Sequence, residues 1–198
     1  MLSASLQMPA AGRTPADTQL VAWFTEARGQ KVRHVPASLP DMMKIEALLE
    51  WEYRNALVRT GTQAVASMRD TMALLRDPAH EFELALPLAQ LEAFASGTGY
   101  WGGLSADIRA RQIEHMAAVC DELYPSLRLY AFDSHRIYSA PVTTFGNQLA
   151  VIYVGNVYAV FRRIAQVRAL IGHFDGLVRE AAVEARRMGA HLRALKVR

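Results

Sequence analysis

The chain has 198 residues, a formal net charge of +3, 52% apolar and 21% charged residues, and one cysteine, Cys120. These totals are those of a soluble globular protein with one large or two small domains, and they exclude a disulfide framework or a cysteine-rich zinc module. No stretch approaches the roughly 20 apolar residues that span a bilayer, and residues 1–12 lack the basic start and apolar core of a secretory signal. We therefore expect a cytoplasmic protein without membrane insertion.

Residues 1–40 are predicted to form an arm, one short helix and a linker. The first 13 residues lean toward Ser, Ala, Pro and Gly, a composition typical of disorder. Thr14-Pro15-Ala16-Asp17 then has the capping residue and first-turn proline of a helix start, and this helix should end near Gly29. Two prolines within Gln30–Pro40 favour a linker before the main domain.

Residues 41–125 are predicted to be helical. A helix should run from Asp41 to about Arg59, and its apolar residues lie on more than one side, with Trp51 and Val58 away from the main stripe. Three more helices are expected at Gln63–Leu75, Pro87–Ala95 and Ser105–Tyr124. A glycine-rich loop, Ser96–Gly103, carries Tyr100 and Trp101 and lacks the Lys-Ser/Thr ending of a phosphate-binding loop.

Residues 126–198 are predicted to form a sheet and one long helix. Gly146-Asn147 and Gly155-Asn156 lie between β-type runs, and a Gly that opens a two-residue type II′ turn needs φ > 0. These turns predict a meander of Val142–Phe145, Gln148–Val154 and Val157–Arg162. Leu127–Asp133 is expected to be its fourth strand, joined through residues 134–136.

The last predicted element is a helix over Ile164–Arg187, whose apolar residues follow a 3.6-residue period and would cover one face of the sheet. The predicted fold is therefore α+β, a helical N-terminal half followed by a four-stranded antiparallel β-meander packed against a long C-terminal helix. Residues 41–198 would make up one domain.

Catalytic and metal chemistry have little support in the sequence. The six histidines are scattered, no His-x-x-x-His or Cys-x-x-Cys pair occurs, and a Gly-x-Ser-x-Gly nucleophile motif is missing. We accordingly predict no catalytic residues, no metal site and no cofactor, and we do not expect an enzyme.

A ligand site has better support, because aromatic side chains with polar tips gather around the predicted sheet and the glycine-rich loop. His173 and Asp175 add titratable groups near the start of the last helix. The candidate ligand-binding residues are Tyr100, Trp101, Tyr138, Tyr153, Tyr158, His173 and Asp175. The alternative is that the aromatic residues form the core of a small sheet.

The charge of the chain is unevenly distributed. From Arg162 onward, nine basic and three acidic residues give +6, which leaves −3 for the rest. Arg168, Arg179, Arg186 and Arg187 fall on one face of the predicted helix and could make weak contacts with nucleic acid. The alternative is a solvated helix face with cations near its C-terminus.

A string of spaced residues between Met43 and Ala185 resembles the C-terminal domain of XRE-type (Cro/repressor-like helix-turn-helix) bacterial transcriptional regulators. The matching residues are Tyr100-Trp101, Gln112, His115, Tyr124-Pro125, Asp133, Ser139-Ala140-Pro141, Phe145-Gly146, Tyr153-Val154-Gly155, Tyr158, Phe161, Arg168 and His173-Phe174-Asp175-Gly176-Leu177. The resemblance implies a regulatory, effector-sensing or dimerising domain that acts as a C2 homodimer through a small-molecule effector or a partner regulator.

The chain departs from that family at its N-terminus, because residues 1–40 are too short for a five-helix DNA-binding domain. We therefore expect no sequence-specific DNA binding by this chain alone. Two other readings stay open, an enzyme with an unrecognised active site and a purely structural interaction protein.

Overall fold

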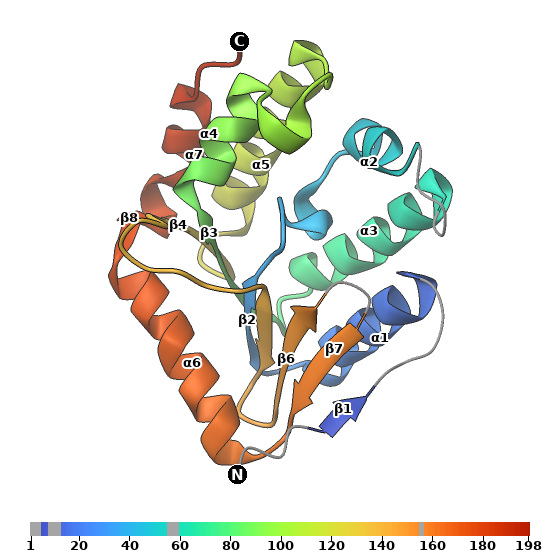
Figure 1. The fold of residues 1–198 in the computed structure, drawn as a ribbon, viewed down its shortest axis with the longest axis vertical. Coiled ribbons are helices and arrows are strands. Elements are labelled where there is room, and N and C mark those ends of the chain that lie inside the picture. Colours follow the sequence, from blue (N-terminus) through green and yellow to red (C-terminus); the bar gives the residue numbers. More distant parts are fainter. Residues whose placement is uncertain (1–4, 8–12, 55–59, 155–156) are drawn as a thin grey trace.

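The fold is that of a computed structural model and is described for residues 5–7, 13–54, 60–154 and 157–198. Its centre is an eight-stranded mixed sheet in the order β1-β7-β6-β5-β2-β3-β4-β8 (Figure 1). The strands are β1 (Ser5–Gln7), β2 (Lys31–Val35), β3 (Glu81–Pro87), β4 (Leu127–Phe132), β5 (Val142–Phe145), β6 (Leu149–Val154), β7 (Val157–Phe161) and β8 (Ala181–Val183).

Helices interleave with these strands along the chain. The α-helices are α1 (Arg13–Glu26), α2 (Glu46–Tyr53), α3 (Gly61–Arg76), α4 (Leu88–Ser96), α5 (Ala106–Leu123), α6 (Ile164–Arg179) and α7 (Ala185–Ala194). Two 3-10 turns, η1 (Asp41–Met43) and η2 (Gly99–Trp101), precede α2 and α5. Within the described residues, no helix is both long enough and apolar enough to cross a bilayer.

The predicted four-stranded antiparallel sheet is wrong, because the sheet has a parallel centre. β2, β3 and β4 run parallel, joined by crossovers that contain α3 and then α4 and α5. Leu127–Asp133 does not join the meander, since β4 pairs with β3 and β8. The predicted linker Gln30–Pro40 contains β2, which pairs with β3 on one side and β5 on the other.

Long-range partners explain why β2 and β3 gave no recognisable strand pattern. Both carry charged residues, and the parallel register places Lys31 beside Glu81 and Arg33 beside Glu83. Opposite charges on adjacent strands stabilise a sheet, but the partners lie 50 residues apart in the sequence. A short strand with charged residues therefore resembles a loop until its neighbour is known.

The three-stranded meander is confirmed as β5, β6 and β7, which pair antiparallel in sequence order. Gly146 has φ +52°, as the turn required, and its N–H donates to the Lys31 carbonyl at 3.0 Å. The loop has three residues instead of two, because Phe145 pairs with Leu149. The second predicted turn, Gly155-Asn156, lies outside the described residues.

Two predicted helices are divided in the structure. The segment from Asp41 forms η1, an extended Lys44 and then α2, while the rest of that prediction falls largely outside the described residues, Val58 included. The long C-terminal helix ends at Arg179, and Ala181–Val183 then adds an edge strand to β4 before α7 begins. Helices at α1, α3, α4 and α5 are confirmed, and Ser105 caps α5 by accepting from the Ile108 N–H.

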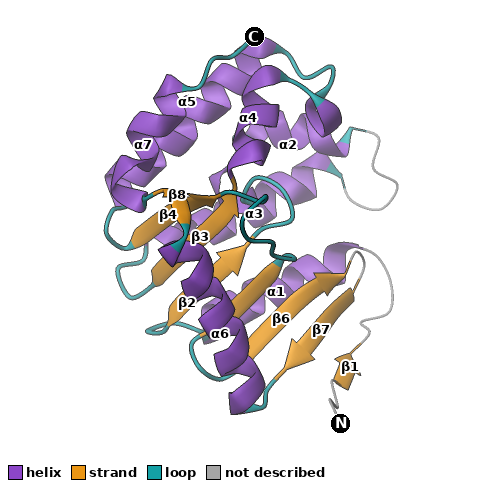
Figure 2. Ribbon diagram, turned by 60° about the vertical axis from the view of Figure 1, so that its left-hand side comes forward, coloured by secondary structure: helices purple, strands orange, loops and turns teal. Residues whose placement is uncertain are grey.

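Helices cover both faces of the sheet (Figure 2). Strand side chains alternate, so that Val32, Leu84 and Leu129 join the large core under α1, α3 and α5. Val35, Ala85 and Phe132 point to the opposite face, where Phe174 and Leu177 of α6 pack on them. We call these the multi-helix face and the α6 face.

Candidate functional site

A cavity of about 270 Å³ opens on the multi-helix face, at the C-terminal end of β2. Its walls come from α1, the segment 34–44, α2, α3 and the strands β5 to β7. The carboxyl ends of parallel strands are the usual place for ligands in sheets with crossover helices, because the chain leaves the sheet there. Most of the lining is aliphatic or aromatic, with several polar side chains among it.

The sequence after β2 turns the chain across this end of the sheet. Pro36 follows the last strand residue and has no N–H to extend a ladder, so pairing with β5 ends at Val35. Pro40, with φ −60° and ψ 120°, precedes η1, where the Met43 and Lys44 N–H groups donate to the carbonyls of Pro40 and Asp41. This tight turn leaves Lys44 in extended backbone, within reach of α2.

Lys44 is the centre of a buried ionic group. Its side chain is 4% exposed, and Nζ donates to Asp41 Oδ1 at 2.6 Å and to Glu52 Oε2 at 2.8 Å. Burial would lower the pKa of Lys44, but the charges of Asp41 and Glu52 outweigh it and raise the pKa above its ordinary value. Lys44 is therefore an ammonium held between two carboxylates at neutral pH.

His34 and Thr143 form a second polar pair in the cavity. They face each other across the β2–β5 register, with His34 Nδ1 and Thr143 Oγ1 2.8 Å apart. Burial lowers the pKa of His34 to about 4, against the opposing charge of Asp41, so that the imidazole is neutral at pH 7. Its Nε2 makes no hydrogen bond to any residue that the structure describes.

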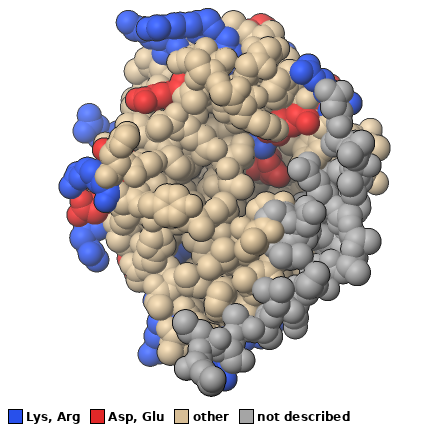
Figure 3. Space-filling view, viewed as in Figure 1, with Lys and Arg blue, Asp and Glu red and all other residues tan. Residues whose placement is uncertain are grey.

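Aromatic rings line the outer part of the cavity. Tyr53, Tyr100, Tyr153 and Tyr158 all contribute, and Tyr153 and Tyr158 lie 5.4 Å apart between ring centroids. Tyr100 is 64% exposed and stands edge-on to Trp51 of α2, with the centroids 6.1 Å apart. Figure 3 shows acidic and basic atoms close together where η1 and α2 lie in Figure 1, on a face that is otherwise mostly uncharged.

No family model, curated protein or solved structure matches the chain. The resemblance to XRE-type regulators therefore stays a prediction. Among the described residues, no group of three or more His, Cys, Asp or Glu side chains is placed to hold a metal ion.

The seven predicted ligand-binding residues do not form one site. Tyr100, Tyr153 and Tyr158 line the cavity, whereas Trp101 is buried behind Tyr100 and packs on Phe94. The same two rings contact Trp51, which the sequence placed away from the main apolar stripe of its helix and which is partly buried.

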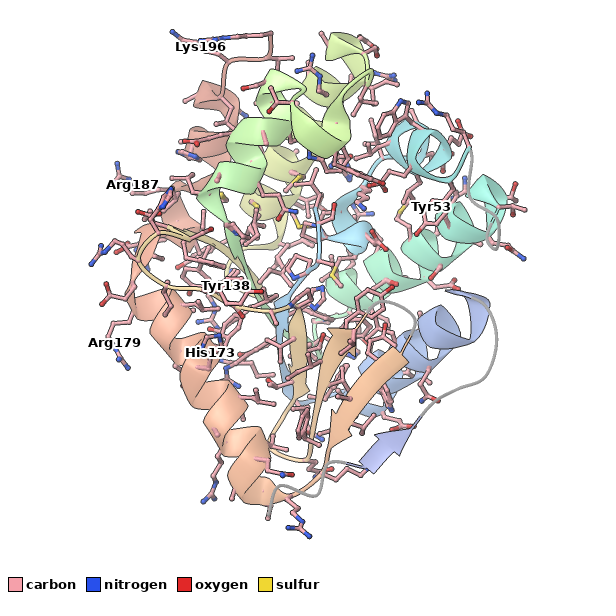
Figure 4. All side chains as sticks on the ribbon, in the orientation of Figure 1. Tyr53, Tyr138, His173, Arg179, Arg187 and Lys196 are labelled. Atoms are coloured by element: carbon pink, nitrogen blue, oxygen red, sulfur yellow. The ribbon has the colours of Figure 1, made fainter. Side chains whose placement is uncertain are left out.

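The other three candidates lie away from the cavity, on the α6 face. Figure 4 shows Tyr138 and His173 beside α6 and Tyr53 on the opposite side of the sheet. Tyr138 is 78% exposed, and His173 Nε2 lies 3.0 Å from Ser139 Oγ. Asp175 contacts Arg33, with 3.4 Å between Oδ1 and Nε.

The polar residues of the cavity were missed because they lie in segments predicted as linker and helix. Asp41, Lys44 and Glu52 follow no ligand motif, and His34 stands in a strand that was not recognised. The one available signal was the β-branched pair Val32 and Val35 around His34, ended by Pro36.

The four candidate arginines are split between two helices, so the predicted single stripe is wrong. Arg168 and Arg179 belong to α6, whereas Arg186 and Arg187 belong to α7 after the β8 break. Arg186 Nε donates to the Tyr124 hydroxyl at 2.8 Å. Arg179 and Arg187 lie on the outer flank of the molecule in Figure 4, and Figure 3 shows basic side chains along that flank.

Proposed function

We propose that this chain is a sensing domain that binds a small molecule in the cavity at the end of β2. The observation that carries the proposal is the cavity itself, where His34, Lys44 and Thr143 are polar lining residues among mostly apolar and aromatic ones. Such a hollow at the carboxyl end of a parallel strand is the common form of a ligand site.

The placement of the walls supports a regulatory role. The lining joins η1 and α2 to the meander β5–β7, so a ligand would contact two parts of the chain about 100 residues apart. Occupancy can then favour one arrangement of these parts, and an effector domain needs such a differential contact to transmit a signal. This agrees with the resemblance to XRE-type regulators, and the proposed setting is the bacterial cytoplasm.

The proposal includes a C2 homodimer, as in regulators of that type. Exposed Val154 and Ile164, each 59% accessible, offer apolar contacts on the described surface. Light scattering at micromolar concentration should give about twice the 22.0 kDa of one chain. A mass of one chain would contradict this part of the proposal and leave the ligand site untouched.

The proposal excludes sequence-specific DNA binding by this chain alone. Arginines on separate helices can contact phosphates, and such contacts carry no sequence information and weaken steeply with salt. An electrophoretic assay should give at most weak retention of DNA at low salt. A discrete complex that survives unrelated competitor DNA at physiological salt would contradict it.

The central experiment is a fragment screen by thermal shift, followed by calorimetry of the hits. A ligand at 100 times its Kd should stabilise the protein by about 2.7 kcal/mol. Ala64→Phe fills the cavity from α3 and should abolish binding, because Ala64 is buried in its wall. The matched control is Ala66→Phe, at an exposed position of the same helix that does not line the cavity.

A second filling variant, Ser67→Leu, covers the case in which Ala64→Phe does not fold, since Ser67 lines the cavity and is only partly buried. Hits that bind the wild type and the Ala66→Phe control but neither filling variant would support the proposal. A screen without hits, or hits that ignore both filling variants, would refute it.

A further inference from the structure

We infer that Gln112 of α5 sets the shape of the cavity, although it does not line the cavity itself. Its carboxamide holds the backbone on both sides of Lys44 and so fixes the 36–45 segment, which joins β2 to α2 and forms one wall. Gln112 is a positioning residue, because it acts on a ligand only through other groups. The inference rests on the proposed function for the use of the cavity and adds the residue that shapes it.

The Gln112 side chain makes two hydrogen bonds to one short stretch of backbone. Its Oε1 accepts from the Ile45 N–H at 2.7 Å, and its Nε2 donates to the Met43 carbonyl at 2.7 Å. Lys44 between them is in extended backbone, with φ −84° and ψ 146°, so the bonded carbonyl and N–H point to the same side. The carboxamide therefore bonds to this stretch as a neighbouring strand would.

Both bonds lie in the interior of the protein. Gln112 is 0% exposed, and so is Met43, whose carbonyl it binds. A polar side chain this deeply buried is tolerated only when it is hydrogen-bonded. Removing the carboxamide would take a partner from two backbone groups in a place closed to water, which costs more than the net gain of an ordinary hydrogen bond. The segment would then lose its reason to keep this conformation.

The 36–45 segment is a large part of the cavity wall, since most of its residues from Pro36 to Lys44 are lining residues. Its apolar residues Leu39 and Met42 are buried in the core as well. Apolar packing is non-directional, so it holds the segment against the core without fixing its exact position. The paired bonds from Gln112 supply that direction.

The same two bonds place the ammonium of Lys44. Its Nζ lies 2.6 Å from Asp41 Oδ1 and 2.8 Å from Glu52 Oε2, and these carboxylates belong to η1 and α2. The backbone of Lys44 lies directly between the two groups that Gln112 holds. A shift of this backbone would move the ammonium and the wall together, so one residue outside the cavity controls both.

The first test is amide hydrogen exchange in the wild-type chain. N–H groups at the start of a helix have no partner within the helix and usually exchange fast. Ile45 directly precedes α2, so its N–H should be protected only through Gln112. After correction for intrinsic rates, we expect it to exchange at least tenfold more slowly than the N–H of Glu46, the exposed first residue of α2. Equal rates would overturn the inference.

The second test probes the cavity with xenon, a neutral atom that binds in apolar cavities and requires no assumption about the natural ligand. Methyl NMR signals of Met68, Val142 and Val151 report its binding, because these residues line the cavity from α3, β5 and β6. Gln112→Met nearly keeps the shape of the side chain and removes both bonds. It should weaken xenon binding at least threefold and speed Ile45 exchange at least tenfold, because a wall that is not held surrounds the atom less closely.

Two controls separate this effect from a general loss of stability. Leu192→Ala removes a buried side chain from α7, which packs on α5 and β4 away from the cavity, and should lower stability while leaving xenon binding unchanged. Ala64→Phe fills the cavity and should abolish xenon binding. If Gln112→Met does not fold, Gln112→Asn replaces it, since the shorter carboxamide cannot reach both backbone groups and should weaken xenon binding as well.

The outcomes separate this inference from the proposed function. If Gln112→Met binds xenon as the wild type does, Gln112 only fills space, and the inference fails while the sensing role stands. A wild type in which xenon shifts none of the three methyl signals would also overturn the inference, because the space would then be closed. A fragment screen without cavity-dependent hits refutes the sensing role, whereas loss of xenon from Gln112→Met would still show that Gln112 shapes the cavity.

Discussion

The two faces of the sheet differ in where their charged side chains come from and in what surrounds them. On the multi-helix face, Lys44, Asp41 and Glu52 are held beside an open volume, next to a neutral histidine. On the α6 face, Glu83 is surrounded by Lys31, Arg33 and Arg128 at 3.4 to 3.6 Å, and Lys31 and Arg33 also border a separate hollow beside Gln30 and the Gly146 loop.

The difference shows how similar charged residues can follow the register of a sheet in one place and come together from a turn and a helix in another. The α6-face charges follow the strand register, with Arg33, Glu83 and Arg128 side by side on β2, β3 and β4. They are a cross-strand ladder that compensates itself. The cavity charges come from a turn and a helix, follow no ladder, and adjoin space that a ligand can fill.

The largest expected effect comes from breaking the buried ionic group. Lys44→Met should lower the free energy of unfolding by about 3–5 kcal/mol, because Glu52 loses a partner in a place closed to water. The matched control is Lys31→Met on the α6 face, where Lys31 is 32% exposed and Glu83 keeps both arginines. There we expect about 0–1 kcal/mol.

Urea unfolding of both variants at pH 7.5 measures this contrast. Equal losses of unfolding free energy in Lys44→Met and Lys31→Met would show that the two lysines contribute alike on both faces. A Lys44→Met protein as stable as the wild type would show that the ionic group is solvated.

The free energy of unfolding, measured at decreasing pH, tests whether His34 is neutral in the folded chain. The pKa of about 4 in the folded chain lies below the ordinary 6.5, so the unfolded chain binds a proton first as the pH falls. Above pH 6.5 the residue has no effect, and stability is lost between pH 6.5 and 4, by up to about 3 kcal/mol at the lower end.

Subtracting a variant isolates this residue from carboxylates that titrate in the same range. His34→Gln removes the titrating group and keeps a partner for Thr143. The free energy of unfolding of the wild type minus that of the variant should therefore fall from pH 7 to pH 4.5. A flat difference would mean that the imidazole is hydrated in the folded chain and protonates as it does in the unfolded one.

The sequence was sufficient to predict one part of the sheet, the antiparallel meander, but not the other, the parallel centre. The meander was accessible, because the Gly146 turn and the β-branched runs on either side of it are local signals. The parallel centre was not, because β2 becomes a strand only when Glu81 and Glu83 neutralise Lys31 and Arg33 from 50 residues away. Alternation of apolar residues alone could not supply that pairing.

The candidate site was predicted only in part, because some of its residues lie on strands with local signals and others on a strand without them. Tyr153 and Tyr158 were found because they lie on the recognisable strands β6 and β7. Lys44 and His34 depend on where β2 ends, so they could not be placed. His173 and Asp175 were grouped with the tyrosines on composition, although α6 carries them to the other face.

The loop at Gly146 gives a smaller effect, at the point where the meander bonds to β2, because any side chain there meets an unfavourable φ and crowds Gln30. Gly146→Val should destabilise by about 1–3 kcal/mol, because a β-branched residue is strained at φ +52°. The control is Gly172→Ala on the exposed side of α6, where an added Cβ meets open space. That change should be neutral or stabilise by up to about 1 kcal/mol. Thermal unfolding of the two variants shows whether the loss of stability is specific to the glycine with positive φ or follows the replacement of either glycine.

The smallest expected effect separates two exposed tyrosines, one on each side of the sheet. Tyr100 stands at the outer part of the cavity against Trp51 and Trp101, with centroids 6.1 and 4.8 Å away, while Tyr138 is 78% exposed beside α6. Tyr100→Ala should cost about 0.5–1.5 kcal/mol through the lost ring pairs and weaken a cavity ligand severalfold, because the ring shields the bound molecule. Tyr138→Ala should change stability by less than about 0.5 kcal/mol and leave ligand affinity unchanged. Calorimetric titration of both variants with the best fragment tests the pair, and loss of binding on Tyr138→Ala would place the ligand on the α6 face instead.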